Sequence, residues 1–408
     1  MPSKFRAGWV LPMTGGPLPG ATITVDAGRI VAVGDEPAAE AADLGAVAVL
    51  PALVNAHTHI ELSYLQGAVP PAPSFLDWIR PLMAARRGYP DPADPRILDA
   101  ARRAIDAARR AGTGVIGDVT NTLVSAPLFE AAGMPAHLFY ELLGFNAADA
   151  GALVSEARRR LEPGTSVPAS AETEVSGSLR RSLAPHAPYS VSPELFRAIR
   201  ADIDAHDTIS TVHLGESAEE VEFIRKGTGG WRALLEELGV WSPDWKAPGT
   251  SPAQYLEDIG FLDGRVLAVH GVQFSGEDLS RLRALNATIV SCPRSNVHVG
   301  VGSPPLEAFY AMDVDVAFGT DSLASAPDLN IFSELAEARR LAPRVPARAL
   351  LESATCVGAR ALGFDADYGT IEPGKRAALI AVRVPEGVGD VEEYLVSGIM
   401  PDRIAWVS

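Results

Sequence analysis

Eight apolar or β-rich runs alternate along this chain with segments of helical spacing, which limits the folds open to it. The runs end near His59, Thr120, Gly144, His186, His213, His270, Pro293 and Asp321. Between them, residues 97–110 place apolar side chains on one helical face and arginines on the other. Strands that alternate with helices imply right-handed crossovers and a parallel sheet. We therefore expect an α/β fold, a TIM-like (β/α)8 barrel, over residues 51–364.

The two ends of the chain differ from this pattern. Residues 5–11, 21–26 and 29–34 are short β-like runs separated by turns, and the same style resumes from about residue 365. Neither end is long enough to bury a core alone. We expect residues 1–50 and 365–408 to form one small β-sandwich domain built from both termini.

The first apolar run of the expected barrel, residues 51–56, ends in His57-Thr58-His59. Because side chains alternate along a strand, His57 and His59 point to the same side at its carboxyl end. Two converging imidazoles form half of a site for a zinc-class metal. A structural histidine with satisfied hydrogen bonds is the alternative for either residue alone, but two in register favour a metal.

Further polar groups end the later runs. They are His186, His213, His270, His298 and Asp321. Polar groups placed repeatedly at the carboxyl ends of strands are typical of the active-site face of a parallel barrel. His137 begins a run and His206 lies in an expected helix-to-strand loop, so we assign structural roles to both.

Composition narrows the class of protein. The 408 residues suit a barrel with a small companion domain, and no apolar span approaches about 20 residues. The N-terminus lacks a signal-peptide pattern, so we expect a cytoplasmic protein. A formal net charge of −16 argues against nucleic acid or an anionic membrane as a partner. Cys292 and Cys356 are too few for a disulfide framework or a thiolate zinc site.

A long excursion over residues 227–260 carries three tryptophans. Long loops at the carboxyl face of a barrel usually shape a substrate pocket. The alternatives are peripheral packing and an oligomer contact, so a homodimer is one expectation.

The ordered set His57-Thr58-His59, His213, His270 and Asp321 resembles the amidohydrolase superfamily. Residues 369–382 are similar to its closing signature, with Ala378 where a further Asp is common. Within that superfamily, residues 213–216 resemble the His-x-x-Glu of aminohydrolases that deaminate heterocycles. The resemblance implies a metal-dependent hydrolase that acts on C–N bonds of a cyclic amidine.

The resemblance also implies a ligand set, which is His57, His59, His213 and Asp321. Many members bridge two metals with a carboxylated lysine, but the lysines here are Lys4, Lys226, Lys246 and Lys375. None lies at a strand end between His59 and His213. We therefore expect one divalent ion per chain, with zinc favoured over iron. Such an ion lowers the pKa of a water ligand toward about 7.

Catalytic roles follow from the same resemblance. Glu216 matches the proton carrier, although it could instead simply begin the next helix, where acids are favoured. His270 would orient and help to deprotonate the water, or it could be a buried histidine bonded to a carbonyl. Asp321 would act as an acid–base partner as well as a ligand.

Three further residues are candidates for binding the substrate. The segment around His186 resembles the strand whose histidine contacts the nucleoside in adenosine-type deaminases. Residues 291–296 and 322–329 look most like aminodeoxyfutalosine deaminases of menaquinone biosynthesis, whose substrate carries adenine, ribose and benzoate. Arg294 could pair with that carboxylate, or alternatively with a helix acid. Glu61 could reach a polar substrate group.

Three functions stay open at this level. The first is an adenine-nucleoside deaminase, acting on 6-aminodeoxyfutalosine or on S-adenosylhomocysteine, methylthioadenosine or adenosine. The second is a related hydrolase of a chlorotriazine or guanine. The third, a non-enzymatic assembly module, is disfavoured because every expected ligand is present.

Overall fold

The computed structural model describes residues 2–34, 41–162 and 179–407. All eight expected strands are present, and each ends within a few residues of its expected position. They are β8 (Leu53–Thr58), β9 (Thr113–Thr120), β10 (Ala136–Leu142), β11 (Leu179–Pro185), β12 (Ser210–Leu214), β13 (Val266–His270), β14 (Thr288–Ser291) and β15 (Val316–Phe318). Almost every residue in them is buried, as expected for strands covered on both faces.

These strands form two parallel sheets, ordered β8-β9-β10-β11 and β12-β13-β14-β15. Backbone hydrogen bonds join the sheets at both seams. At one seam the N–H of His213 donates to the carbonyl of His186, and at the other the N–H of Asp321 donates to the carbonyl of His57. The α/β class and the parallel pairing are therefore confirmed.

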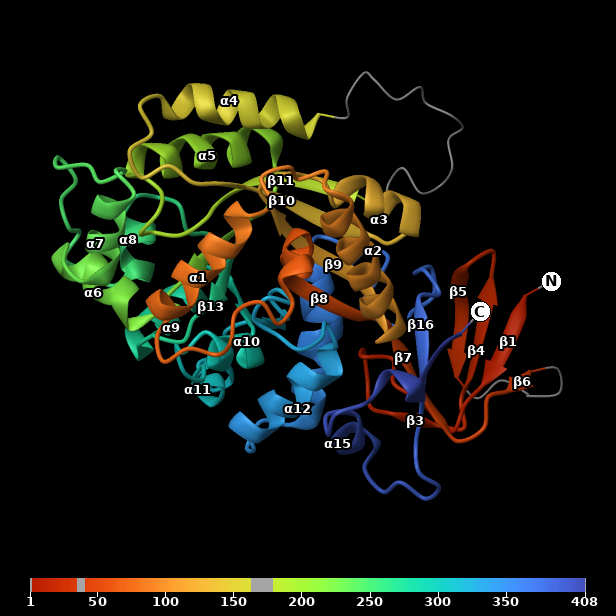
Figure 1. Cartoon of the computed structure of the whole chain (residues 1–408). Helices are drawn as coiled ribbons and strands as arrows, with labels where there is room; N and C mark the ends of the chain where they lie inside the picture. Colours follow the sequence, from red (N-terminus) through yellow and green to blue (C-terminus); the bar gives the residue numbers. More distant parts are fainter. Residues whose placement is uncertain (1, 35–40, 163–178, 408) are drawn as a thin grey trace.

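Helices follow the strands and cover the outside of the sheets (Figure 1). The first eight are α1 (Phe75–Arg87), α2 (Pro95–Arg110), α3 (Ala126–Ala132), α4 (Ala150–Leu161), α5 (Pro193–His206), α6 (Ala218–Lys226), α7 (Gly230–Glu237) and α8 (Pro252–Asp258). The rest are α9 (Gly276–Ala284), α10 (Pro293–His298), α11 (Leu306–Ala311), α12 (Ile331–Leu341), α13 (Ala347–Glu352), α14 (Gly358–Ala361) and α15 (Val391–Leu395). Serine hydroxyls at Ser192, Ser217 and Ser275 accept from backbone N–H groups at the starts of α5, α6 and α9, which stabilises these termini.

The terminal segments build two further sheets. One is ordered β5-β4-β1-β6 and the other β17-β16-β7-β2-β3. Their bounds are β1 (Ser3–Arg6), β2 (Trp9–Val10), β3 (Leu18–Pro19), β4 (Thr22–Asp26), β5 (Arg29–Gly34), β6 (Ala42–Asp43), β7 (Val47–Pro51), β16 (Leu379–Arg383) and β17 (Ile404–Val407). Ile23, Val49 and Leu379 belong to one shared apolar cluster. Residues from both ends of the chain thus pack together, beside the parallel sheets (Figure 1).

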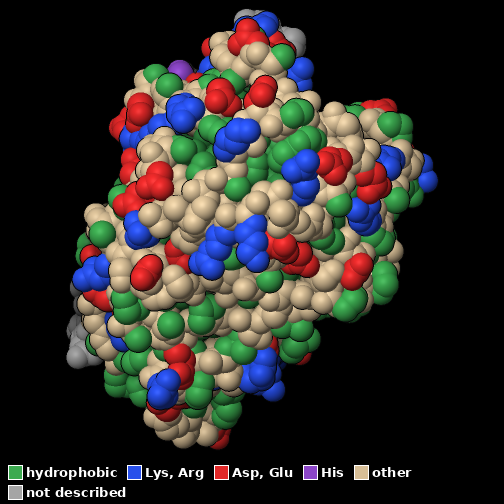
Figure 2. Space-filling view, turned by 90° about the vertical axis from the view of Figure 1, so that its left-hand side faces the viewer, with side chains coloured by type: hydrophobic (Ala, Val, Ile, Leu, Met, Phe, Trp, Pro, Cys, Tyr) green, Lys and Arg blue, Asp and Glu red, His purple; other side chains and the backbone are tan. Residues whose placement is uncertain are grey.

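The surface carries charges of both signs. On the face shown in Figure 2, acidic and basic side chains are interspersed rather than gathered into one patch. Within the described ranges, no helix combines the length and the apolar character needed to cross a bilayer.

Two histidines with expected structural roles lie away from the strand ends. His137 contacts the hydroxyl of Ser182 at 2.9 Å and the carbonyl of Leu362 at 3.3 Å. The sequence predicted that His206 lies in a loop, but it is the last residue of α5. Its Nδ1 lies 2.8 Å from the carbonyl of Asp202, one turn earlier in the same helix.

Candidate active site

Four side chains from three strands converge at the carboxyl ends of the parallel sheets. His57 and His59 come from the end of β8, His213 from β12, and Asp321 lies three residues after the end of β15. His59 Nε2 lies 3.3 Å from His213 Nε2. Asp321 Oδ1 lies 3.6 Å from His59 Nε2 and 3.8 Å from His57 Nε2. All four ligands expected from the sequence are therefore brought together.

The cluster fits a divalent cation. Both ring nitrogens of His57 are buried and have no hydrogen-bond partner among the described residues, an arrangement that is costly unless a ligand completes it. Two ligands of a tetrahedral zinc ion lie about 3.4 Å apart, close to the spacing of these donors. Burial lowers the pKa of His57, so the imidazole is neutral and its lone pair is free to coordinate.

Neighbouring groups orient these ligands. The Nδ1 of His213 lies 2.9 Å from the carbonyl of His186, which directs its Nε2 into the cluster. The hydroxyls of Ser295 and Ser325 donate to Asp321 Oδ2 at 2.6 and 3.0 Å and leave Oδ1 open. Burial alone would raise the pKa of Asp321, but the nearby histidines outweigh it and hold that pKa below its usual value.

Glu216 lies beside the cluster, after a tight turn that follows β12. Gly215 has φ of +62°, and a side chain there would collide with the ring of Phe274. The Glu216 side chain is 5 % exposed, and its Oε1 lies 3.6 Å from His270 Nε2. Burial, together with the charge of Asp321, raises its pKa well above the usual value. A raised pKa favours the protonated form of this carboxyl group, which is the form that can donate a proton.

His270 ends β13 and has a positive φ of 77°, as Asp321 does at 57°. Such backbone conformations are strained for residues other than glycine and are concentrated at functional sites. The Nδ1 of His270 lies 2.9 Å from the side-chain nitrogen of Asn296, so its Nε2 faces Glu216. Burial lowers the pKa of His270 to about 3.

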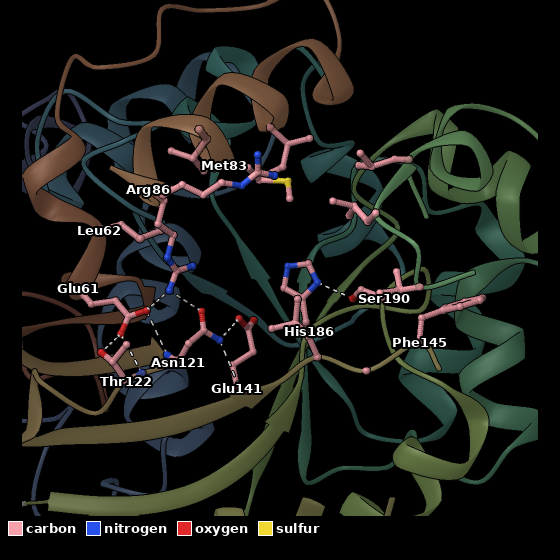
Figure 3. Close-up of a pocket in the computed structure, with 18 of the residues that line it drawn as sticks. Glu61, Leu62, Met83, Arg86, Asn121, Thr122, Glu141, Phe145, His186 and Ser190 are labelled. Atoms are coloured by element: carbon pink, nitrogen blue, oxygen red, sulfur yellow. Dashed lines mark hydrogen bonds and ion pairs between the residues drawn. The ribbon is translucent and has the colours of Figure 1, made fainter. Parts of the chain in front are cut away.

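A cavity of about 800 Å³, shown in Figure 3, adjoins His213 through two of its lining residues, Glu141 and His186. Its apolar wall includes Leu62, Phe75, Met83, Phe145, Trp231, Leu234, Leu238 and Val240. Its polar side carries Glu61, Arg86, Asn121, Glu141 and His186 (Figure 3). The loop over residues 227–260 thus contributes to the cavity, and the ring of Trp231 stacks on that of Tyr189 with centroids 3.7 Å apart. This volume suits a ligand the size of a drug molecule.

His186 and Glu61 both line this cavity. His186 Nδ1 lies 2.6 Å from the hydroxyl of Ser190, which leaves its other ring nitrogen for a ligand. Glu61 is saturated instead, since it accepts from the hydroxyls of Thr120 and Thr122, two backbone N–H groups and Arg86. Its carboxylate therefore organises the cavity wall, which differs from the direct substrate contact expected from the sequence.

Arg294 is not brought to the cavity, and this corrects the sequence-based assignment. Its guanidinium donates to Glu334 at 2.7 Å and to Asp328 at 2.9 Å, and it is not among the cavity-lining residues. The alternative pairing with a helix acid is the one observed, because the Glu334 side chain is fully buried on α12 and needs a cation. His298, at the end of α10, likewise lies apart and contacts the carbonyl of Val69.

Sequence reasoning missed several residues of the site. Glu141 could have been noticed as an acid inside the apolar run 136–142, whereas Asn121 and Asn296 carry no such signal. Arg86 and Arg87 belong to α1, within a long loop whose position the sequence does not specify.

Comparison with known proteins agrees with this geometry. Residues 48–399 match the model of the amidohydrolase family. A 5-methylthioadenosine/S-adenosylhomocysteine deaminase of Halobacterium salinarum is 32% identical over 88% of this chain and 78% of its own length. An aminodeoxyfutalosine deaminase of Deinococcus radiodurans is 31% identical over 78% of this chain and 74% of its own.

Among solved structures, an adenosine deaminase from Xanthomonas campestris with bound zinc superimposes with a TM-score of 0.80. It is 26% identical, and the match covers 98% of this chain and 90% of that one. The family match spans both parallel sheets and every residue of the His–Asp cluster. The chain therefore belongs to the amidohydrolase family and is a hydrolytic enzyme that acts on C–N bonds.

Proposed function

We propose that this protein is a metal-dependent hydrolytic deaminase of an adenine-type nucleoside. The observation that carries the proposal is the buried Glu216, which lies 3.6 Å from His270 and beside the cluster of His57, His59, His213 and Asp321. Deamination of an aminopurine needs a proton donor at the ring nitrogen next to the carbon that is attacked. The names of the similar deaminases support the same reaction.

The residues divide the chemistry between them. His57, His59, His213 and Asp321 would hold one divalent ion, with zinc favoured, and that ion would lower the pKa of a bound water so that hydroxide is available near neutral pH. Glu216 gives its proton to the ring nitrogen as a C–O bond forms at the adjacent carbon. His270 orients the attacking water, and Asp321 Oδ1 accepts the proton that this water loses and passes it to the departing amine. The C–N bond then breaks, ammonia leaves, and the new hydroxyl returns its proton to Glu216 to give the keto product.

The substrate that fits best is 6-aminodeoxyfutalosine. An aryl carboxylate on the far side of the ribose needs apolar walls and a cation, and the cavity has both. One guanidinium nitrogen of Arg86 donates to Glu61 and Asn121, and the other nitrogens remain available to a ligand. Arg87 is exposed on the same lining and has no ion pair among the described residues. These two arginines replace Arg294 as the candidates for a carboxylate contact.

A panel of nucleosides tests this proposal by release of ammonia. We expect 6-aminodeoxyfutalosine to exceed adenosine and methylthioadenosine in kcat/KM by about 10–150-fold, the value of one charge-assisted hydrogen bond. Arg87→Met should erase most of that preference and spare adenosine, while Arg103→Met, on the exposed face of α2, should change neither. S-Adenosylhomocysteine is the second candidate, since the Halobacterium relative is named for it. A preference for adenosine or methylthioadenosine would contradict the proposed carboxylate contact, but the broader assignment as a nucleoside deaminase would still hold.

We also propose a finer organisation. The eight parallel strands would close into a (β/α)8 barrel over residues 51–364, with residues 1–50 and 365–408 as the β-sandwich. These ranges include residues 1, 35–40, 163–178 and 408, which lie outside the described residues. A cytoplasmic location, a homodimer and a small-molecule substrate without nucleic-acid or membrane partners complete the proposal. Sedimentation of the purified protein tests the homodimer.

A further inference from the structure

Glu141 is a buried acid that the chemistry above does not use. It is the sixth residue of β10, is 6 % exposed, and lies on the cavity wall between Asn121 and His186 (Figure 3). Acids are rarely buried to this extent unless a partner satisfies them. Its position raises the question of what completes its hydrogen bonding.

One carboxylate oxygen of Glu141 has a partner and the other has none. Oε2 accepts from the side-chain nitrogen of Asn121 at 2.9 Å. Oε1 is buried and has no hydrogen-bond donor among the described residues. Nδ1 of His213 lies 3.5 Å away, but it is already engaged with the carbonyl of His186 at 2.9 Å. One strong acceptor of a cavity-lining residue is therefore left without a donor among the described residues.

His186 adds a second acceptor beside it. The hydroxyl of Ser190 donates to the carbonyl of Ala187, which leaves it to accept from His186 Nδ1. In that tautomer the other ring nitrogen of neutral His186 is an acceptor. A ring nitrogen of His186 and a carboxylate oxygen of Glu141 lie within 4.8 Å of each other. Two neighbouring acceptors without donors match a group that brings two hydroxyls.

We propose that Glu141 is a specificity-determining residue that accepts a hydrogen bond from a ribose hydroxyl of the substrate, with His186 accepting from the neighbouring hydroxyl. This inference rests on the proposed nucleoside-deaminase function. A carboxylate is the group that protein sites use to bind the hydroxyls of a nucleotide ribose. A site built to bind a hydroxyl rejects an analogue that lacks it, because its own acceptor is then left buried and unpaired.

The test compares adenosine with 2′-deoxyadenosine and 3′-deoxyadenosine on the metal-loaded enzyme. Wild type should favour adenosine over at least one deoxy analogue by about tenfold or more in kcat/KM. Glu141→Gln should bring that ratio close to one by slowing adenosine, with the deoxy analogue and the metal content unchanged. Glu130→Gln, an exposed acid paired with Arg181 on the outer surface, is the matched control and should keep the wild-type ratio.

Product binding provides a second measurement that needs no variant. Wild type should bind inosine about tenfold more tightly than the 2′- or 3′-deoxyinosine that lacks the recognised hydroxyl. Equal binding of all three, or equal substrate ratios in wild type and Glu141→Gln, would overturn the inference. Loss of one metal equivalent in Glu141→Gln would overturn it too, since Glu141, His186 and His213 would then hold a cation. If no adenine nucleoside is deaminated, the proposed function fails, and the binding comparison still decides the role of Glu141.

Discussion

The side chain of Glu220 holds the backbone of Glu216 in place, with its Oε2 accepting from the Glu216 N–H at 2.9 Å. Its Oε1 accepts from the N–H of Gly215 at 3.0 Å, so one buried carboxylate fixes the turn between His213 and Glu216. The ordering is needed because Gly215 is a flexible residue in a left-handed conformation. In the proposed mechanism, the position of Glu216 would thus depend on the carboxylate of Glu220.

The first prediction concerns Glu216→Gln. The variant keeps the size of the side chain but cannot donate a proton, so kcat should fall by at least about 10² while bound metal stays the same. Steady-state kinetics with elemental analysis measures both. Glu219→Gln, in the first turn of α6, is the control and should retain activity. Release of the metal from Glu216→Gln would instead make Glu216 a ligand.

The second prediction concerns Glu220→Gln and pH. Burial raises the pKa of Glu220 from 4.5 to about 7 in the folded protein. Between these values the folded state binds more protons than the unfolded state, so this contribution is present below pH 4.5 and is lost as pH rises toward about 7. The variant should therefore show a shallower decline of unfolding free energy across that window, by an amount on the order of 3 kcal/mol.

Denaturant titrations at several pH values measure this slope. Glu277→Gln, an exposed acid in the first turn of α9, should leave the slope unchanged. An identical slope in wild type and Glu220→Gln would show that Glu220 is ionised throughout the range.

The third prediction concerns the metal. No lysine is placed at the described strand ends to bridge two ions, so we expect about one tightly bound divalent ion per chain. His213→Ala should lose that ion and most activity but keep its secondary structure, because the apolar packing of the sheets does not involve the ligands. Elemental analysis and circular dichroism measure the two effects. Two catalytic ions in wild type would contradict the single-ion site.

The fourth prediction separates stability from specificity at Arg294. Arg294→Met leaves the carboxylate of Glu334 buried without its cation, and we expect a loss of about 3–5 kcal/mol in unfolding free energy. The ratio of rates among nucleoside substrates should not change. Adding Glu334→Leu should restore much of the stability, since an apolar pair needs no charge compensation. If the ratio of rates among the nucleosides changed in Arg294→Met while the unfolding free energy did not, Arg294 would instead be a substrate-binding residue.

The sequence by itself determined the parallel strands and the placement of His57, His59, His213 and Asp321 at or near their carboxyl ends. Both depend on local information: strand periodicity places His57 and His59 on one side, and the carboxyl ends of parallel strands meet at one edge. The residue types at those ends then limit the chemistry. Even the positions of the strand ends came out within a few residues.

Only the tertiary structure decided the partners of the charged side chains. Arg294 and Glu334 lie 40 residues apart, and Glu61 is satisfied by groups some 60 residues away. A buried charged side chain either pairs with another group of the protein or stays available to a ligand. Which of the two occurs depends on the distant groups that come within hydrogen-bond reach, and the periodicity of the sequence does not specify them. For that reason Arg294 forms a structural ion pair, whereas Glu141 Oε1 has no hydrogen-bond donor among the described residues.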